Sequence, residues 1–260
     1  MSKYDLSFSQ PLMNATGSLG FVPDPYGPVD IEPFGAFITN PISRGARTPA
    51  HGQRLFPFPG GFLLHTGYPN PGLRTALRRY ETQWARSSLP VIVHLLPEDV
   101  EEIREMVRLL ERVDGLLAVE VGLPPEVDAA STTAFARAAC GELPVIVRLP
   151  YEHRLELARA AAEVEIAAVS LAPPRGAALN PSGNLVHGRL YGPALFPLAL
   201  DAVHAMAQSG IPVIGAGGIS SQEQVDAMLK AGALAVQVDS ALWCGGWGKR
   251  TATPAALQAL

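Results

Sequence analysis

The sequence predicts an α/β protein with the fold of a (β/α)₈ TIM barrel, formed as a single domain by residues 1–260. Three observations support this prediction. The chain has 260 residues, close to the roughly 250 that such a barrel uses. Short apolar runs rich in β-branched residues alternate with longer amphipathic segments. Most of the runs are apolar throughout, as expected for parallel strands that are covered on both faces.

Eight short segments are expected to form the strands, and eight is the number that closes such a barrel. They are residues 11–15, 36–40, 91–95, 117–122, 145–150, 167–172, 213–218 and 235–240. Two of them begin within the sequence LPVIV and a third within IPVI. In each case the proline ends the helical side of the junction, and the β-branched residues start the strand.

Amphipathic segments between the strands are expected to form the helices that cover the barrel. They span residues 98–111, 132–139, 154–164, 197–209 and 221–231, and a further helix starts near Leu73. Strand and helix thus alternate along the chain, as in a barrel built from repeated βα units.

Two long segments, residues 41–72 and 172–196, interrupt this alternation and are expected to be irregular loops. Structureless loops of this length in a compact domain usually have a function. Both follow strands at their C-terminal ends, where barrel proteins assemble their active sites. We therefore expect the two segments to cover the C-terminal mouth of the barrel.

The composition of the chain disfavours some classes of binding partner. Hydrophobic residues make up 48% of the chain and charged residues 17%, which is typical of a folded globular protein. The formal net charge of −4 gives no basic surface of the kind that binds nucleic acid or acidic membranes. Cys140, Cys244 and the six histidines show no spacing typical of a disulfide framework or a metal site. Because no apolar signal core or membrane span is found, we expect a cytoplasmic protein.

The strongest local motif is GAGGIS at residues 215–220, which lies between an expected strand and an expected helix. Free backbone amides at such a turn and helix N-terminus bind phosphate. The amides of Gly217, Gly218 and Ser240 are therefore candidates for a phosphate site, since the loops after the last two strands of a barrel often form one. The alternative is a tight turn without a ligand. A serine stands where the dinucleotide fingerprint needs its third glycine, which disfavours a Rossmann fold.

A series of motifs resembles the FMN-dependent dihydroorotate dehydrogenases over nearly the whole chain. The motifs are NATG at 14–17, the FITNP-SRG stretch at 37–45, GYPNPG at 67–72, VEVG, VIVRLP, YGPALFPLAL, and GAGGI followed by VQVDSAL. The resemblance implies FMN over the C-terminal mouth, a CH–CH oxidoreductase and a role in pyrimidine biosynthesis. The cofactor-binding positions that it implies are Ala15, Thr16, Gly17, Asn40, Arg148, Gly192, Gly217, Gly218 and Ser240.

The chain also departs from the pattern of that family. Where the family implies a lysine, an asparagine, a lysine and a glycine, this chain has Asn40, Leu64, Arg148 and Asp239. Residues 122–125, with the sequence GLPP, replace an asparagine-rich motif that carries the catalytic cysteine or serine base. Asp239 is the most unfavourable change, because a carboxylate beside a dianionic phosphate repels it.

Few side chains are candidates to replace the missing base. Glu126 is the first candidate catalytic residue and Ser131 the second, although both also suit the start of a helix. Arg148 is expected either to hold the flavin or an anionic ligand, or to pair with Glu120 inside the barrel. His94 could face the mouth or be structural.

Further side chains could contact a ligand from the two long segments, and loop packing or solvent exposure is the alternative for each. They are His65, the arginines Arg44, Arg47, Arg175 and Arg189, which suit an anion, and Tyr68 and Tyr191, which suit a planar ring.

Two functions remain open. The first is a dihydroorotate dehydrogenase-like FMN oxidoreductase with a divergent, small and anionic substrate. The second is a degenerate barrel that has lost FMN or redox turnover and acts as a binding or regulatory protein. The sequence leaves a homodimer open as the assembly.

Overall fold

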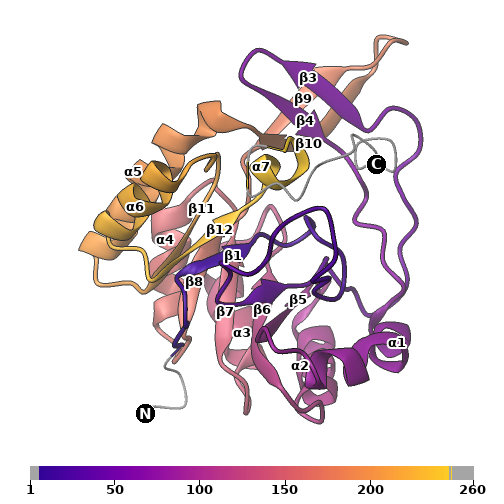
Figure 1. The fold of residues 1–260 in the computed structure, drawn as a ribbon, viewed down its shortest axis with the longest axis vertical. Coiled ribbons are helices and arrows are strands. Elements are labelled where there is room, and N and C mark those ends of the chain that lie inside the picture. Colours follow the sequence, from indigo (N-terminus) through magenta and orange to yellow (C-terminus); the bar gives the residue numbers. More distant parts are fainter. Residues whose placement is uncertain (1–5, 246, 248–260) are drawn as a thin grey trace.

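The computed structural model describes residues 6–245 and 247. Eight parallel strands form a barrel with helices around it, which confirms the predicted (β/α)₈ fold (Figure 1). In the order in which they are hydrogen-bonded, the strands are β1 (Leu12–Asn14), β12 (Ala235–Val238), β11 (Val213–Ala216), β8 (Ala168–Leu171), β7 (Val145–Leu149), β6 (Leu116–Gly122), β5 (Val91–Leu95) and β2 (Phe37–Ile38).

The barrel closes between β1 and β2 through a side chain. A single parallel bridge joins Met13 to Ala36. Beyond it, the side-chain nitrogen Nδ2 of Asn14 donates to the Ile38 carbonyl at 2.7 Å, and the backbone amide of Ile38 donates to Asn14 Oδ1 at 3.0 Å. Asn14 is fully buried, and its side-chain amide supplies the hydrogen bonds that the buried backbone groups of Ile38 require.

The helical elements are α1 (Leu73–Ala85), α2 (Val100–Leu110), α3 (Ala129–Ala139), α4 (Arg154–Ala162), the 3₁₀ turn η1 (Pro193–Leu195), α5 (Phe196–Gln208), α6 (Gln222–Lys230) and the short α7 (Ser240–Trp243). Helices α1 to α6 form where the sequence predicts them, whereas the turn η1 and the short helix α7 were not predicted. Helix α3 starts three residues earlier than expected because the Asp128 carboxylate caps it by accepting from the Ser131 amide at 2.8 Å.

Each strand is buried on both faces, which explains the continuous apolar runs. Alternate residues such as Val93, Val119 and Val147 point outward and pack in the main core with the helices. The residues between them point inward, where Ile92 and Ile146 belong to a second apolar cluster inside the barrel. The period of two along a strand thus separates two cores.

The two long segments are not irregular loops, so that part of the prediction is wrong. They contain β3 (Leu55–Phe58), β4 (Gly61–Leu64), β9 (Arg175–Leu179) and β10 (Leu185–Tyr191), which form an antiparallel sheet in the order β3-β4-β10-β9. We call these four strands the roof sheet (Figure 1). Its central pairing aligns Leu64 with Arg189, so β4 finds its partner far away in the sequence.

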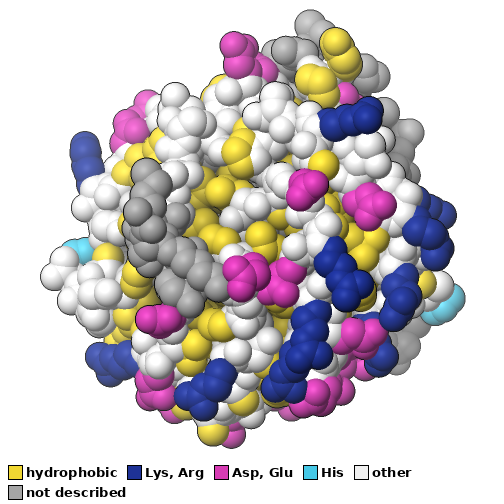
Figure 2. Space-filling view, turned by 90° about the horizontal axis from the view of Figure 1, so that it is seen from below, with side chains coloured by type: hydrophobic (Ala, Val, Ile, Leu, Met, Phe, Trp, Pro, Cys, Tyr) yellow, Lys and Arg dark blue, Asp and Glu magenta, His cyan; other side chains and the backbone are white. Residues whose placement is uncertain are grey.

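The surface is mixed in charge on the face drawn in Figure 2, where acidic and basic side chains are interspersed. Within residues 6–245 and 247, no helix has both the length and the apolar character that crossing a bilayer requires. The same residues contain no cluster of three or more His, Cys, Asp or Glu side chains arranged to hold a metal ion.

Candidate functional site

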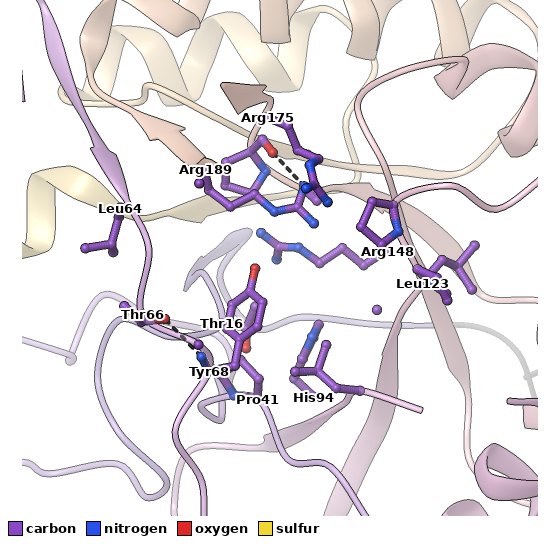
Figure 3. A pocket seen from close by; sticks show the side chains of 18 of the residues that line it. Thr16, Pro41, Leu64, Thr66, Tyr68, His94, Leu123, Arg148, Arg175 and Arg189 are labelled. Carbon is purple, nitrogen blue, oxygen red and sulfur yellow. Dashed lines mark hydrogen bonds between the residues drawn. The ribbon is translucent and has the colours of Figure 1, made fainter. Parts of the chain in front are cut away.

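A cavity of about 600 Å³ lies between the C-terminal ends of the barrel strands and the roof sheet. Arg148 from the barrel and Arg175 and Arg189 from the roof sheet lie together on one side of it (Figure 3). Thr16, Tyr68 and His94 lie across from them. The volume is within the range of small-molecule sites.

Below the cavity lies a layer of polar side chains inside the barrel, each contributed by a different strand, and two of them, His94 and Arg148, line the cavity. The layer consists of His94 on β5, Glu120 on β6, Arg148 on β7, Ser170 on β8 and Gln237 on β12. Each follows an inward-facing apolar residue by two positions, so it also points inward, one layer closer to the mouth. Strand register aligns them, since His94 pairs with Glu120 and Arg148 pairs with Ser170.

The Glu120 carboxylate is the centre of this layer. Its Oε1 accepts from Ser170 Oγ and from Gln237 Nε2, both at 2.7 Å. Its Oε2 lies 2.6 Å from His94 Nδ1 and 3.5 Å from Arg148 Nη1. The Arg148 Nη1 also donates to Gln237 Oε1 at 3.1 Å. The buried charge is therefore paired and fully hydrogen-bonded, as burial requires.

Burial and neighbouring charges shift the pKa values of Glu120 and His94 in opposite directions. Burial by itself raises the pKa of Glu120, but the Arg148 guanidinium and hydrogen bonds from His94 and Gln237 outweigh it and lower the pKa to about 2. Burial lowers the pKa of His94 below its ordinary value of 6.5, although Glu120 opposes this. At neutral pH the layer therefore contains a carboxylate, a guanidinium and a neutral imidazole.

The cavity has an excess of positive charge. Glu98 is the acidic side chain at its rim, and the Arg47 guanidinium already pairs with it at 2.9 Å. Arg189 is held in place because its Nη1 donates to the Pro173 carbonyl at 2.9 Å. Arg44 instead pairs with Glu105 at 2.9 Å, away from the cavity. The arginines of the second long segment thus contribute more to the cavity than those of the first.

The structure places some of the residues expected to contact the flavin ring at the cavity and others beside it. Thr16 and Arg148 line the cavity, and Arg148 also makes the alternative contact with Glu120. Ala15 and Gly17 flank Thr16 in the chain, but neither lines the cavity. Asn40 instead accepts a hydrogen bond from the Gly20 amide at 3.1 Å.

The candidate bases are not at the cavity. Glu126 is exposed to solvent and is not among the cavity-lining residues, and Ser131 lies in the first turn of α3.

The glycines expected at the phosphate are used for close backbone packing. A Cβ on Gly192 would clash with the Gly60 carbonyl oxygen in the β3–β4 turn. A Cβ on Gly218, at φ +68°, would lie 2.5 Å from the Phe196 amide nitrogen at the start of α5. Gly217 borders a separate cavity of only about 10 Å³, which it shares with Asp239. That volume holds about one water molecule, not a phosphate group.

The Asp239 carboxylate takes the hydrogen bond that the Ser240 amide was expected to donate to a phosphate. This hydrogen bond also caps α7. Asp239 is buried, and burial raises its pKa above the ordinary value. Because the Ser240 amide is already bonded to Asp239 and the adjoining cavity measures only about 10 Å³, the residues at this end do not fit the phosphate of FMN.

Replacing Asp239 with glycine is therefore expected to increase the affinity for FMN about 10- to 100-fold. The change frees the Ser240 amide and removes a like charge, and a hydrogen bond to a charged group contributes about 1.5–3 kcal/mol. Quenching of flavin fluorescence measures the affinity. Asp239→Asn, which removes the charge but keeps the side-chain volume, is the matched control. Unchanged or weaker uptake by Asp239→Gly would contradict this placement of the phosphate.

The aromatic candidates differ in their availability. Tyr191 stacks on Phe62 with ring centroids 5.7 Å apart and meets Trp243 edge-on at 5.2 Å, so its faces are already in contact with other rings. Tyr68 lines the cavity in a left-handed backbone conformation at φ 53°. Of the two tyrosines, Tyr68 is the better placed to contact a ligand.

Sequence reasoning missed Ser170 and Gln237, although a signal was present. Several of the predicted strands carry a polar residue within an apolar run, as in VIVHL, LAVEVG, VIVRLP, AAVSLA and AVQVDS. A polar residue that recurs at the same position in neighbouring strands indicates a buried polar layer. His187, which lines the cavity from β10, had no comparable signal.

Comparisons with known proteins agree with this architecture. A family model described as dihydroorotate dehydrogenase matches residues 2–250. The dihydroorotate dehydrogenase B (NAD(+)) catalytic subunit of Desulforudis audaxviator is 30% identical over 258 residues, covering 91% of this chain and 84% of that protein. The Geobacter sulfurreducens protein of the same name is 31% identical over 269 residues, covering 93% and 88%.

A solved structure supports the fold alone. The crystal structure of DHODH from Eimeria tenella in complex with ferulenol has a TM-score of 0.72 and 16% identity, covering 93% of this chain and 80% of that one. Barrel topology, the order of the motifs and the match of the family model along almost the whole length agree. The chain belongs to the dihydroorotate dehydrogenase family.

Proposed function

We propose that the cavity binds a small organic anion, such as a carboxylate, and that the chain does so without FMN. The observation that carries this proposal is the set of three arginines around one cavity, Arg148, Arg175 and Arg189. Arginine is the side chain best suited to bidentate recognition of carboxylate or phosphate groups. The fit of the Asp239 carboxylate, and not of a phosphate, at α7 supports binding without FMN.

Arg148 would anchor the ligand. It uses Nη1 for its contacts with Glu120 and Gln237, and no described residue bonds to its Nη2 or Nε. The buried contacts hold the guanidinium in one orientation, so little conformational entropy is lost when an anion binds. Arg189, fixed by the Pro173 carbonyl, would complete the positive side of the site.

A dihydroorotate dehydrogenase-like FMN oxidoreductase is the second candidate. The family supports it, and so does the cavity beside Thr16 and Arg148, where the resemblance places the flavin ring. Flavin absorbance of the purified protein distinguishes the two candidates. A yellow protein favours the oxidoreductase, whereas a colourless protein that does not take up added FMN favours the anion-binding barrel. A homodimer in the cytoplasm stays a prediction for either candidate.

Binding of orotate, used as a small planar carboxylate probe, is expected to weaken about 10- to 100-fold in Arg189→Gln. The variant removes a charged hydrogen-bond donor, and such a bond contributes about 1.5–3 kcal/mol. Isothermal titration calorimetry at fixed ionic strength measures the affinity. Arg74→Gln is the matched control, because Arg74 is exposed and pairs with Glu105 at 3.2 Å. Equal affinity in the two variants would contradict the proposed site.

A further inference from the structure

His94 is held by Glu120 in a way that leaves one ring nitrogen facing the cavity. Its side chain is 2% exposed and its Nδ1 lies 2.6 Å from Glu120 Oε2, so an ionised Glu120 makes Nδ1 the protonated nitrogen. No described residue bonds to Nε2, and Nε2 is not among the buried polar atoms that lack a partner. The Nε2 lone pair is therefore open to the cavity that His94 lines.

The last residue of β6 leaves room for this nitrogen. Gly122 lies directly beyond Glu120 on the inward face, and a Cβ at that position would come within 2.9 Å of His94 Nε2. The dihydroorotate dehydrogenase resemblance places an asparagine-rich motif with a cysteine or serine base there. The glycine that begins the sequence GLPP thus uncovers Nε2 at the same place where the usual base has been replaced.

Arg148 and His94 line the same cavity, so a ligand held by Arg148 would share that cavity with this nitrogen. Glu120 Oε2 is 2.6 Å from His94 Nδ1 and 3.5 Å from Arg148 Nη1, so the two side chains flank one oxygen atom. The charged groups that act on His94 are Glu120 on β6, Arg148 on β7 and Arg189 on β10. Burial keeps the imidazole neutral, and therefore able to accept a proton, at neutral pH.

We propose that His94 is an acid–base catalytic residue of the cavity, with Nε2 as the proton acceptor for a small carboxylate held by Arg148 and with Glu120 as its positioning residue. This inference rests on the proposed anion-binding function. It gives the chain a base in place of the cysteine or serine that the family pattern implies and this chain lacks, and in place of Glu126, which does not line the cavity.

The step is a proton transfer within the bound complex. An acidic C–H or N–H bond of the ligand breaks, its electron pair stays on the ligand, and the proton forms the Nε2–H bond. The Glu120 carboxylate stabilises the resulting imidazolium, as the acid of a catalytic triad does for its histidine. Return of the same proton to another atom of the ligand completes a tautomerisation or isomerisation, which needs neither an oxidant nor a reductant.

Carboxymethylation of the unmodified protein with bromoacetate tests this assignment. Bromoacetate is itself a small carboxylate. When the Nε2 lone pair attacks its methylene carbon, an N–C bond forms and bromide leaves. Peptide mass spectrometry is expected to find His94 modified at least about tenfold faster than His65 and His187. These two histidines line the same cavity and are the internal controls.

The pH dependence and a neutral reagent separate the two proposals. Because burial lowers the pKa of His94 below 6.5, its reaction rate is expected to fall at a lower pH than that of a histidine with the ordinary pKa. Bromoacetamide, which lacks the carboxylate, is expected to react at least about tenfold more slowly than bromoacetate, and inorganic phosphate should protect His94 from bromoacetate.

Modification of His94 at equal rates by both reagents would contradict anion binding. It would still agree with an Nε2 that is open to the cavity. Modification of His65 or His187 in preference to His94 would overturn the assignment of His94, even where calorimetry shows orotate binding. A signal from protonated Nε2 instead of protonated Nδ1 in imidazole ¹⁵N spectra at neutral pH would overturn the role of Glu120.

Discussion

Purified protein supplied with FMN, dihydroorotate and an electron acceptor is expected to form orotate at least about 10²-fold more slowly than a catalytically active relative. Loss of a positioned general base costs about 10²–10⁴-fold in rate. Residues 122–125 have replaced the motif that carries that base in the family resemblance. The Ser240 amide, expected at the phosphate of FMN, is already bonded to Asp239. The two losses act on one reaction, so their effects should not simply add.

Orotate formation followed by absorbance measures this rate. The Geobacter sulfurreducens protein, assayed in parallel with the same acceptor, provides the reference. A flavin-dependent rate within about tenfold of the reference would contradict the expectation. Loss of that rate in Glu126→Gln would then identify Glu126 as a replacement base, despite its exposed position in the structure.

Replacing Glu120 with leucine is expected to lower the free energy of unfolding by about 3–5 kcal/mol, since breaking a buried ion pair leaves its partner charge uncompensated. Arg148 would lose its carboxylate, and Ser170 and Gln237 would lose the acceptor that both now contact at 2.7 Å. Urea unfolding measures the effect. Glu98→Gln is the control because Glu98 is exposed and pairs with Arg47, and exposed pairs contribute about 0–1 kcal/mol. Equal effects would contradict the central role of Glu120.

The dependence of stability on pH provides a second comparison of wild-type protein with Glu120→Leu. The folded-state pKa of Glu120 is lowered from 4.5 to about 2, so its contribution is complete above about pH 4.5 and is lost as the pH falls toward 2. This lowering of the Glu120 pKa corresponds to a contribution of about 3 kcal/mol to the free energy of unfolding. Wild-type protein should therefore lose more stability than Glu120→Leu between pH 5 and pH 2.5. Parallel curves would show that another carboxylate is responsible.

The barrel could be predicted from the sequence because each strand is buried on two faces. Burial on both faces removes polar residues from nearly every position, and runs such as VIVHL and VIVRLP stand out against the amphipathic helices. The roof sheet could not be predicted, because β4 pairs with β10 across more than a hundred residues and because Pro57, Gly60 and Gly61 break the apolar sequence pattern of the first hairpin. Local propensity contains no information about such a distant partner.

The site was predicted in part. Arg148 could be singled out because an arginine within an apolar strand needs a charged partner, and Glu120 is that partner. Asp239 could be singled out because a carboxylate is unfavourable beside a phosphate. Its use as a cap for α7 could not be foreseen, since that depends on backbone geometry at Ser240. The access of His94 Nε2 to the cavity depends on the space left by Gly122 on a neighbouring strand, which only the folded register reveals.

The pairing of β4 with β10 has a consequence for how the molecule folds. Barrel strands β5 to β8 are consecutive in the chain and pair with their immediate neighbours, so they can assemble through comparatively local contacts. The ladder between Leu64 and Arg189 closes a much longer loop, and contacts of high sequence separation form slowly because their entropy cost precedes their gain. We therefore expect the cavity to be among the last parts of the protein to mature, and a nascent chain to acquire its anion site only after residue 191 has been synthesised.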